Sequence, residues 1–116
     1  PVHQILSSNF IDEKALLKTE YIIHLAGAGI ADKRWTDERK QTIIDSRVKT
    51  ANLLFDKINE LNIDLKGFIS ASGIGYYGAV TSDKIFKETD KPGTDFLSDV
   101  CVKWENAALQ FKKNKI

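Results

Sequence analysis

The segment from residue 67 to 78 holds the side chains best suited to chemistry, because a short apolar run ends there in serines, glycines and paired tyrosines. Ser72, Tyr76 and Tyr77 offer hydroxyl and phenol groups that can bind, orient or protonate a ligand oxygen. The glycines between them leave the backbone open to close approach. No partner base for these groups is evident in the chain, so the segment by itself indicates a ligand crevice.

A second segment of small residues, from Leu25 to Gly29, follows another apolar run that begins at Tyr21. In an open parallel sheet, ligands bind outside the carboxyl ends of the strands. A flat cofactor or a sugar could therefore lie across both segments. The alternative interpretation is that these glycines only form turns.

Arg34 and Trp35 lie between the first small-residue segment and the next helix. Arg34 could bind a phosphate or carboxylate and Trp35 could stack on a ring, which makes them candidate substrate-binding residues. The alternative is a solvated loop in which Trp35 anchors the helix. His24 lies inside an apolar strand and is predicted to be a hydrogen-bonded core residue. Cys101 lies on the apolar stripe of a helix and is predicted to be a packed thiol.

The elements that must position these residues alternate between strands and helices. Strands are expected at residues 2–6, 21–25 and 68–71, and helices at 13–18, at 37–61 and from about 96 onward. Their expected N-caps are Asp12, Thr36 and either Thr94 or Asp95. Strands separated by helical crossovers are expected to lie parallel, which predicts an α/β fold.

Apolar spacing predicts which face of the two long helices meets the sheet. The predicted stripes comprise, in the first helix, Ile44, Val48, Ala51, Phe55 and Ile58, and, in the last, Leu97, Val100, Cys101, Trp104, Ala108 and Phe111. A polar loop at residues 79–93 separates the last strand from the last helix.

The composition excludes several classes of protein. With 42% hydrophobic residues in 116, the chain is not disordered and suits one domain. A net charge of +1 gives no case for nucleic acid or an anionic membrane as partner. No run of about 18 apolar residues or signal peptide is visible, and a single cysteine fits a reducing, cytoplasmic compartment. No Cys/His spacing typical of a metal site is present.

The chain begins at Pro1, contains no Met and ends within a helical pattern at Ile116, so we expect an internal piece of a longer protein.

Several motifs occur together in this order and resemble one family. They are residues 24–36 (His-Leu-Ala-Gly-Ala-Gly-Ile-Ala-Asp-Lys-Arg-Trp-Thr), 45–48 (Asp-Ser-Arg-Val), 69–78 (Ile-Ser-Ala-Ser-Gly-Ile-Gly-Tyr-Tyr-Gly), 95–97 (Asp-Phe-Leu), 100–101 (Val-Cys) and 104–105 (Trp-Glu). This set resembles the atypical short-chain dehydrogenase/reductases known as NAD-dependent epimerase/dehydratases or sugar-nucleotide epimerases. The resemblance covers residues 12 to 109.

The resemblance implies a Rossmann-type parallel sheet with flanking helices, of which residues 1–116 would be the central part of a single NAD(P)-binding domain. The N-terminal strands and the C-terminal part would be missing, and with them the residues that choose between NAD and NADP. The adenosine side of the cofactor would be lined by Leu25, Ala26 and Gly27. The nicotinamide side would be approached by Ser70, Ala71 and Ser72.

The implied activity is hydride transfer on a nucleotide-sugar-like substrate. Ser72 would polarise the substrate oxygen, and Tyr76 or Tyr77 would carry the proton. The family's Tyr-x-x-x-Lys pair falls on Leu97 and Cys101, which cannot do that chemistry, and its catalytic hydroxyl position falls on Gly73. The alternative is a non-catalytic dinucleotide-binding sensor or partner-binding module.

A missing first strand would also leave one edge of the strand at residues 21–25 bare. We therefore expect pairing with another chain, as in a homo-oligomer.

Overall fold

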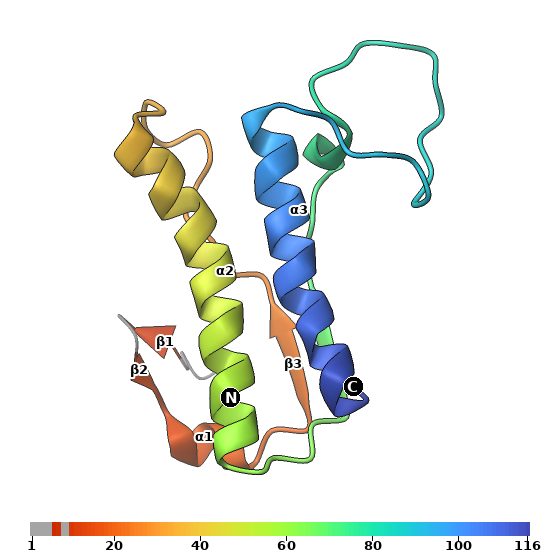
Figure 1. The fold of residues 1–116 in the computed structure, drawn as a ribbon. Helices are drawn as coiled ribbons and strands as arrows, with labels where there is room; N and C mark the ends of the chain where they lie inside the picture. Colours follow the sequence, from red (N-terminus) through yellow and green to blue (C-terminus); the bar gives the residue numbers. More distant parts are fainter. Residues whose placement is uncertain (1–5, 8–9) are drawn as a thin grey trace.

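A computed structural model describes residues 6–7 and 10–116 and shows an α/β arrangement (Figure 1). β3 (Tyr21–His24) and β4 (Gly67–Ser70) form a parallel pair, and α2 (Asp37–Glu60) connects them. α3 (Phe96–Leu109) lies beside α2 on the same face of this pair. The expected strand–helix–strand–helix order with parallel strands is thus confirmed for this part of the chain.

Smaller elements complete the fold. β1 (Leu6–Ser7) and β2 (Phe10–Ile11) form a two-stranded antiparallel ribbon, and α1 (Glu13–Leu17) follows it. The short 3-10 helices η1 (Ile74–Tyr77) and η2 (Gln110–Asn114) come after β4 and α3. Most of the strand predicted at residues 2–6 lies outside the described residues.

Side-chain caps begin the helices where the sequence predicts them. The Asp12 carboxylate accepts hydrogen bonds from the backbone N–H groups of Lys14 and Ala15, which begins α1. The Thr36 hydroxyl accepts from Arg39 N and begins α2. Of the two candidates for α3, Asp95 is the cap, because its carboxylate accepts from Ser98 N. Each cap satisfies backbone donors that the helix itself leaves free.

The buried stripe of α2 differs by one residue from the predicted stripe at three positions. Ala51 and Ile58 are buried as predicted, but the remaining core positions are Ile43, Arg47 and Leu54. The predicted Ile44, Val48 and Phe55 are only half-buried. The prediction from hydropathy was wrong at these positions because one core position is an arginine, Arg47. Its guanidinium is buried beside hydrogen-bond acceptors, which are described below.

In α3 the prediction is closer to the structure. Val100, Cys101, Trp104 and Phe111 are buried as expected, the last of them in η2. Leu97 and Ala108 are half-buried instead. Two small residues, Ser98 and Ala107, take the fully buried places on that side.

The two faces of the β3–β4 sheet differ in their packing. Ile22 and His24 face α2 and α3 and are buried, and Phe68 stacks on Phe111 with ring centroids 3.8 Å apart. On the other face Ile23 is 63% and Ile69 57% exposed. The helices therefore hold the strands from one side. The expected pairing through a bare strand edge stays a prediction.

β3 points toward the end of the molecule where α2 and α3 begin (Figure 1), and β4 runs parallel to it. The main core cluster packs the opposite end, around Leu16, Leu54, Ile58 and Phe111. Burial of each such side chain contributes about 1.5–3 kcal/mol. No helix in the described part of the chain has the length and apolar character needed to cross a membrane.

Candidate functional site

The carboxyl ends of β3 and β4 meet, as the sequence predicts. His24 pairs with Ser70, and Ala71 N donates a hydrogen bond to His24 O at 3.1 Å. Leu25, Ala26 and Gly27 leave β3 with exposed side chains or backbone. Two segments of small residues thus leave the sheet side by side. We call the segment at residues 25–35 the first loop and the segment at residues 71–95 the second loop.

The first loop is held by side chains of α2. The Ser46 hydroxyl accepts a hydrogen bond from Ala28 N at 2.9 Å. Arg47 donates to Ala28 O at 3.2 Å, and Arg39 donates to Gly29 O at 2.6 Å. These contacts hold the backbone of the first loop at Ala28 and Gly29 and do not involve the small side chains there.

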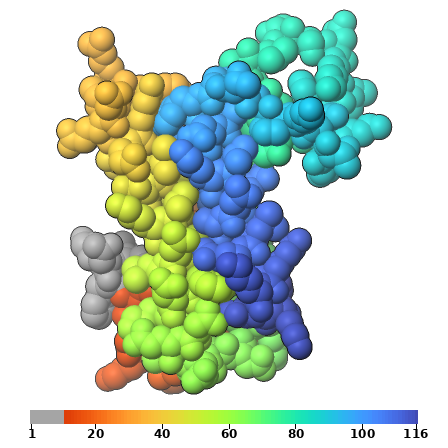
Figure 2. Space-filling view, in the orientation of Figure 1, coloured from red at the N-terminus to blue at the C-terminus, as the bar shows by residue number. Residues whose placement is uncertain are grey.

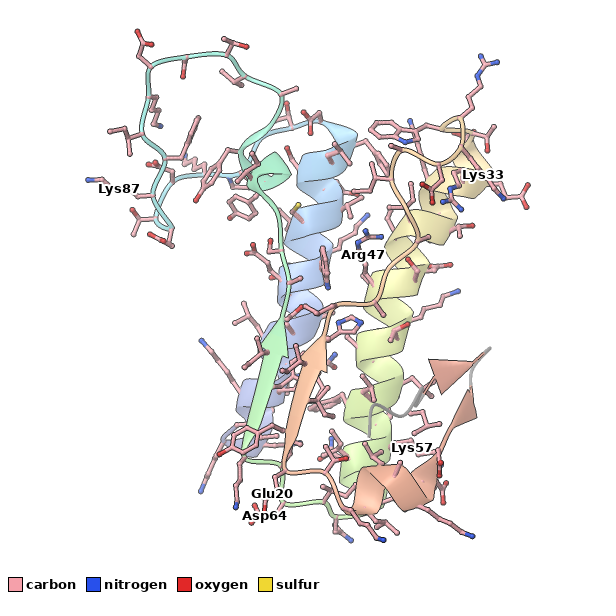
Figure 3. All side chains as sticks on the ribbon, turned by 180° about the vertical axis from the view of Figure 1, so that it is seen from behind. Glu20, Lys33, Arg47, Lys57, Asp64 and Lys87 are labelled. Carbon is pink, nitrogen blue, oxygen red and sulfur yellow. The ribbon has the colours of Figure 1, made fainter. Side chains whose placement is uncertain are left out.

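Arg47 is buried at the centre of this arrangement (Figure 3). Its guanidinium also donates to Ile43 O at 2.9 Å and lies over the Trp104 ring at 4.8 Å. A Cβ added to Gly27 would come within 2.7 Å of the guanidinium carbon, so a larger residue there would have to displace the guanidinium. Burial lowers the pKa of Arg47, and the hydrogen bonds compensate for the lost water.

His24 closes the inner side of the same region. It is buried, as predicted, with its ring 6.0 Å from that of Phe68 and 6.4 Å from that of Trp104. The predicted hydrogen bond is wrong, because neither ring nitrogen has a partner among the described residues. Burial, together with the charge of Arg47, lowers the pKa of His24 and favours the neutral imidazole. His24 therefore acts as a core residue at the strand end.

The second loop surrounds a cavity of about 350 Å³. The walls of this cavity bring together all three residues that the sequence singled out for chemistry, with others, namely Ser72, Gly73, Ile74, Tyr76, Tyr77, Glu88 and Glu105. The Ser72 hydroxyl donates a hydrogen bond of 2.5 Å to Glu105 Oε1. The cavity adjoins the carboxyl end of β4, because Ser72 is only two residues beyond Ser70.

α3 and a close backbone contact position η1 beside this cavity. The buried Ser98 hydroxyl donates to Gly75 O at 3.1 Å, and Gly93 N donates to Tyr76 O at 2.8 Å. Gly78 has a φ of 89°, and a Cβ on Gly93 would lie 2.6 Å from Gly78 Cα. Both glycines are therefore required for the two ends of residues 79–92 to meet.

Residues 79–92 stand out from the body of the molecule as a long excursion (Figure 2). Tyr77 connects to it, since its hydroxyl donates to Lys87 O at 3.0 Å and its ring stacks on Phe86 at 4.6 Å. Burial, followed by the negative charges of Glu88 and Asp90, raises the pKa of Tyr77. The Tyr77 phenol thus keeps its proton.

The two positions of the family's Tyr-x-x-x-Lys pair face the second loop. A Cβ added to Gly75 would contact Leu97 Cβ at 3.4 Å, and Cys101 Sγ lies 3.7 Å from Gly73 O. Burial raises the pKa of Cys101, which disfavours a thiolate. Glu105 follows one helical turn later, and its carboxylate accepts a hydrogen bond from the Ser72 hydroxyl.

Arg34 and Trp35 are not among the residues that line this cavity. Trp35 donates from Nε1 to Ile30 O at 2.7 Å and packs edge-on against Phe96 at 5.1 Å. It thus ties the first loop to the start of α3. The Arg34 side chain is exposed beside Lys33, which Figure 3 shows at the outer end of the first loop.

Sequence reasoning gave no role to Ser46, Arg47 or Glu105, although all three lie in the motifs of the resemblance. An available signal for Arg47 was its place in a stripe drawn through positions 43, 47, 51, 54 and 58. For Glu105 it was the four-residue spacing from Cys101. The described residues contain no group of three or more His, Cys, Asp and Glu side chains able to hold a metal ion.

Comparisons with known proteins point in one direction. No family model matches the chain. An epimerase family protein of Mycobacterium leprae is 34% identical over 108 residues, which are 93% of this chain and 34% of that protein. One from Staphylococcus aureus (strain NCTC 8325) is 35% identical over 105 residues, 88% of this chain and 34% of that protein. The chain thus spans about a third of the length of these curated relatives.

Two solved structures share the fold. A nucleoside-diphosphate sugar epimerase from Corynebacterium glutamicum superposes with a TM-score of 0.71 at 30% identity, over 90% of this chain and 22% of that one. The human epimerase family protein SDR39U1 (isoform 2), crystallised with NADPH, gives a TM-score of 0.72 at 24% identity, over 91% of this chain and 38% of that one. The predicted Rossmann-type α/β fold is thereby confirmed.

Proposed function

We propose that this chain, which is similar to epimerase family proteins over most of its length, forms the central part of a single NAD(P)-binding Rossmann domain in a protein of sugar-nucleotide epimerase type. The observation that carries the proposal is the meeting of two open strand ends, joined by the hydrogen bond from Ala71 N to His24 O. A dinucleotide binds across such a crevice in doubly wound sheets. The human neighbour with NADPH supports the same cofactor class.

The residues present suit such a cofactor. Leu25, Ala26 and Gly27 are exposed, and the backbone behind them is fixed by α2, so a flat group can approach closely. In our proposal these three residues line the adenosine side. Ser70, Ala71 and Ser72 approach the nicotinamide from β4.

The cavity beside Ser72 is the proposed site of reaction. When bound, the cofactor would accept or return a hydride, and a nucleotide-sugar-like substrate would present a hydroxyl to Ser72. Tyr76 and Tyr77 are the candidate proton carriers, although the Tyr77 hydroxyl must first leave Lys87 O. Arg34 and Trp35, at the outer first loop, remain candidates for contact with the substrate's distal part.

A second function is favoured by one observation. Leu97 and Cys101 occupy the positions of the usual proton-transfer pair and face the second loop. A protein with these residues could bind the dinucleotide as a sensor or partner-binding module without turnover. The two functions share cofactor binding and differ in hydride transfer.

Calorimetric titration of the full-length protein with NADPH and NADH tests cofactor binding. We expect binding by the wild type and at least a tenfold weaker affinity for Ala26→Trp, because the added ring fills the space beside the first loop. Ala31→Trp, equally exposed in the same loop, is the matched control and should bind as the wild type does. Absence of NAD(P)H binding by the wild type would overturn the proposal.

Transfer of deuterium from labelled cofactor to a nucleotide sugar separates the two functions. We expect transfer by the wild type and its loss in the pair Ser72→Ala with Tyr77→Phe. Cofactor binding without transfer would select the sensor function. Undiminished transfer by the pair would exclude these two residues from catalysis.

A further inference from the structure

We propose that Glu105, in place of the candidate carriers Tyr76 and Tyr77, accepts through Ser72 the proton of the substrate hydroxyl during hydride transfer. This inference rests on the proposed function and names a group for the step that the family's missing pair would perform. Its basis is the 2.5 Å hydrogen bond from Ser72 Oγ to Glu105 Oε1, on the wall of a cavity of about 350 Å³.

The hydrogen bond fixes the direction in which Ser72 can act. A serine hydroxyl has one proton to donate and two lone pairs that accept. Because that proton is directed to the Glu105 carboxylate, Ser72 offers its lone pairs to a ligand in the cavity. Ser72 is thereby suited to receive a hydroxyl proton from a substrate alcohol, which differs from the polarising donor role that the family resemblance implies.

Helix geometry explains why Glu105 can replace the absent pair. Leu97, Cys101 and Glu105 are spaced by four residues and share one face of α3. The Leu97 side chain has no acidic or basic group, and the Cys101 thiol is directed to Gly73 O. Glu105 is the member of this row whose carboxylate meets the Ser72 hydroxyl.

The step balances when it is written for a secondary alcohol of the substrate and the oxidised cofactor. The C–H bond breaks and its electron pair leaves as hydride to the nicotinamide of NAD(P)⁺. The O–H proton passes to Ser72 Oγ, while the original Ser72 proton passes to the Glu105 carboxylate. The products are a ketone, NAD(P)H and protonated Glu105, and the reverse step returns the same proton to the oxygen.

The groups around Glu105 matter because the proposal requires its ionised form. They are Cys101 on its own helix, Tyr76 and Tyr77 of η1, and Glu88 from the second loop. Glu88 is the other carboxylate on the cavity wall.

The experiment uses the full-length protein with NAD⁺ or NADP⁺ and UDP-glucose as the probe alcohol. We expect Glu105→Gln to lower kcat about 100-fold, within the range for loss of general acid–base catalysis, with little change in KM. Ser72→Ala should lower it similarly, and the double variant should lose no more than either single one.

Asp99→Asn is the matched control, since it removes a carboxylate from the same helix, where Asp99 pairs with Lys103 on the surface. It should keep kcat within about twofold. A readout without turnover is the infrared carboxylate band of Glu105, identified as the band missing from Glu105→Gln. Ser72→Ala should shift that band, because the carboxylate loses a hydrogen bond, and Asp99→Asn should not.

Two outcomes would overturn the inference, namely unchanged kcat in Glu105→Gln, or no oxidation of the probe by a wild type that binds the cofactor. In each case NAD(P)H titration still reports on the proposed function separately. Absence of cofactor binding by the wild type would instead mean that the proposed function is wrong.

Discussion

The first and second loops leave adjacent strands, yet the structure holds them in different ways. The first loop is fixed through its backbone, by Ser46 and Arg47 at Ala28 and by Arg39 at Gly29. The second loop also presents polar side chains to its neighbours, with Ser72 on Glu105 and Tyr77 on Lys87 O. Residues 26–29 of the first loop thus offer a fixed surface of small residues, and the second loop offers hydroxyl and phenol groups around a cavity.

This difference suggests a division of labour at the strand ends. A fixed backbone without bulky side chains suits a cofactor that must be held close and in one orientation. Hydroxyls and a carboxylate around a cavity suit proton transfer to a substrate. Changes in the first loop and its anchors should therefore act on stability and cofactor affinity, and changes in the second loop on turnover.

The largest expected effect comes from removing the anchor of the first loop. Arg47→Ala deletes the part-buried hydrogen bond to Ala28 O, the buried one to Ile43 O and the contact with Trp104. We expect a loss of about 3 kcal/mol in the free energy of unfolding, measured by urea denaturation of the full-length protein. Affinity for NADPH should fall as well, because the first loop loses a tether.

Lys49→Ala is the control for this prediction. Lys49 lies on the same helix and forms a surface ion pair with Asp45, with its side chain 71% exposed. Such pairs contribute less than about 1 kcal/mol. Equal losses in the two variants would show that the buried guanidinium does not anchor the loop.

A smaller effect is expected from one added methyl group in each loop. A Cβ on Gly27 would lie 2.7 Å from the Arg47 guanidinium carbon, whereas a Cβ on Gly73 would first meet Cys101 Sγ at 3.7 Å. Gly27→Ala should cost about 1–3 kcal/mol by overpacking, and Gly73→Ala should stay within about 0.5 kcal/mol of the wild type. Thermal and urea unfolding of both variants measure the difference.

A larger loss of stability in Gly73→Ala than in Gly27→Ala would contradict the view that the first loop is the more tightly packed of the two. The comparison would be sharpened by Gly73→Ser, which adds a hydroxyl at the position where the family resemblance expects one. Since the space beside Gly73 admits an ordinary contact, this variant should fold as stably as the wild type.

Local signals in the sequence predicted much of the fold. The caps Asp12, Thr36 and Asp95 and the two apolar strands depend on neighbours within a few residues, so their patterns are visible in the chain. The predicted buried face of α2 was wrong because Arg47 occupies a core position. Hydropathy alone does not predict that a guanidinium is buried where it can donate hydrogen bonds.

The site could be predicted only in part, for a physical reason. The strand ends were identified from small residues, and the structure places Ser72, Tyr76 and Tyr77 around one cavity. The partner of Ser72 lies 33 residues further along the chain, and no local pattern connects them. Contacts of this kind depend on how α3 packs against η1, which the sequence does not display.

The smallest expected effect concerns the pH dependence of stability at the inner end of the first loop. Burial and the charge of Arg47 lower the pKa of His24 in the folded state from an ordinary value of 6.5. A lowered pKa means that the unfolded chain binds the proton first, so stability is complete above pH 6.5 and declines as pH falls through that value. One such group contributes at most about 1.4 kcal/mol per pH unit. Urea unfolding at pH 8 and pH 6 measures this slope, which His24→Phe should reduce.

Asp95→Asn is the control that separates His24 from the carboxylates. Hydrogen bonds from Ser98 and Ala79 lower the pKa of Asp95 below its ordinary 3.8, so its contribution is complete above that value and disappears only in stronger acid. The variant should therefore keep the wild-type slope between pH 8 and pH 6. A slope that persists in His24→Phe would mean that another group titrates there, and the neutral His24 would then not distinguish the inner end of the first loop from the second loop.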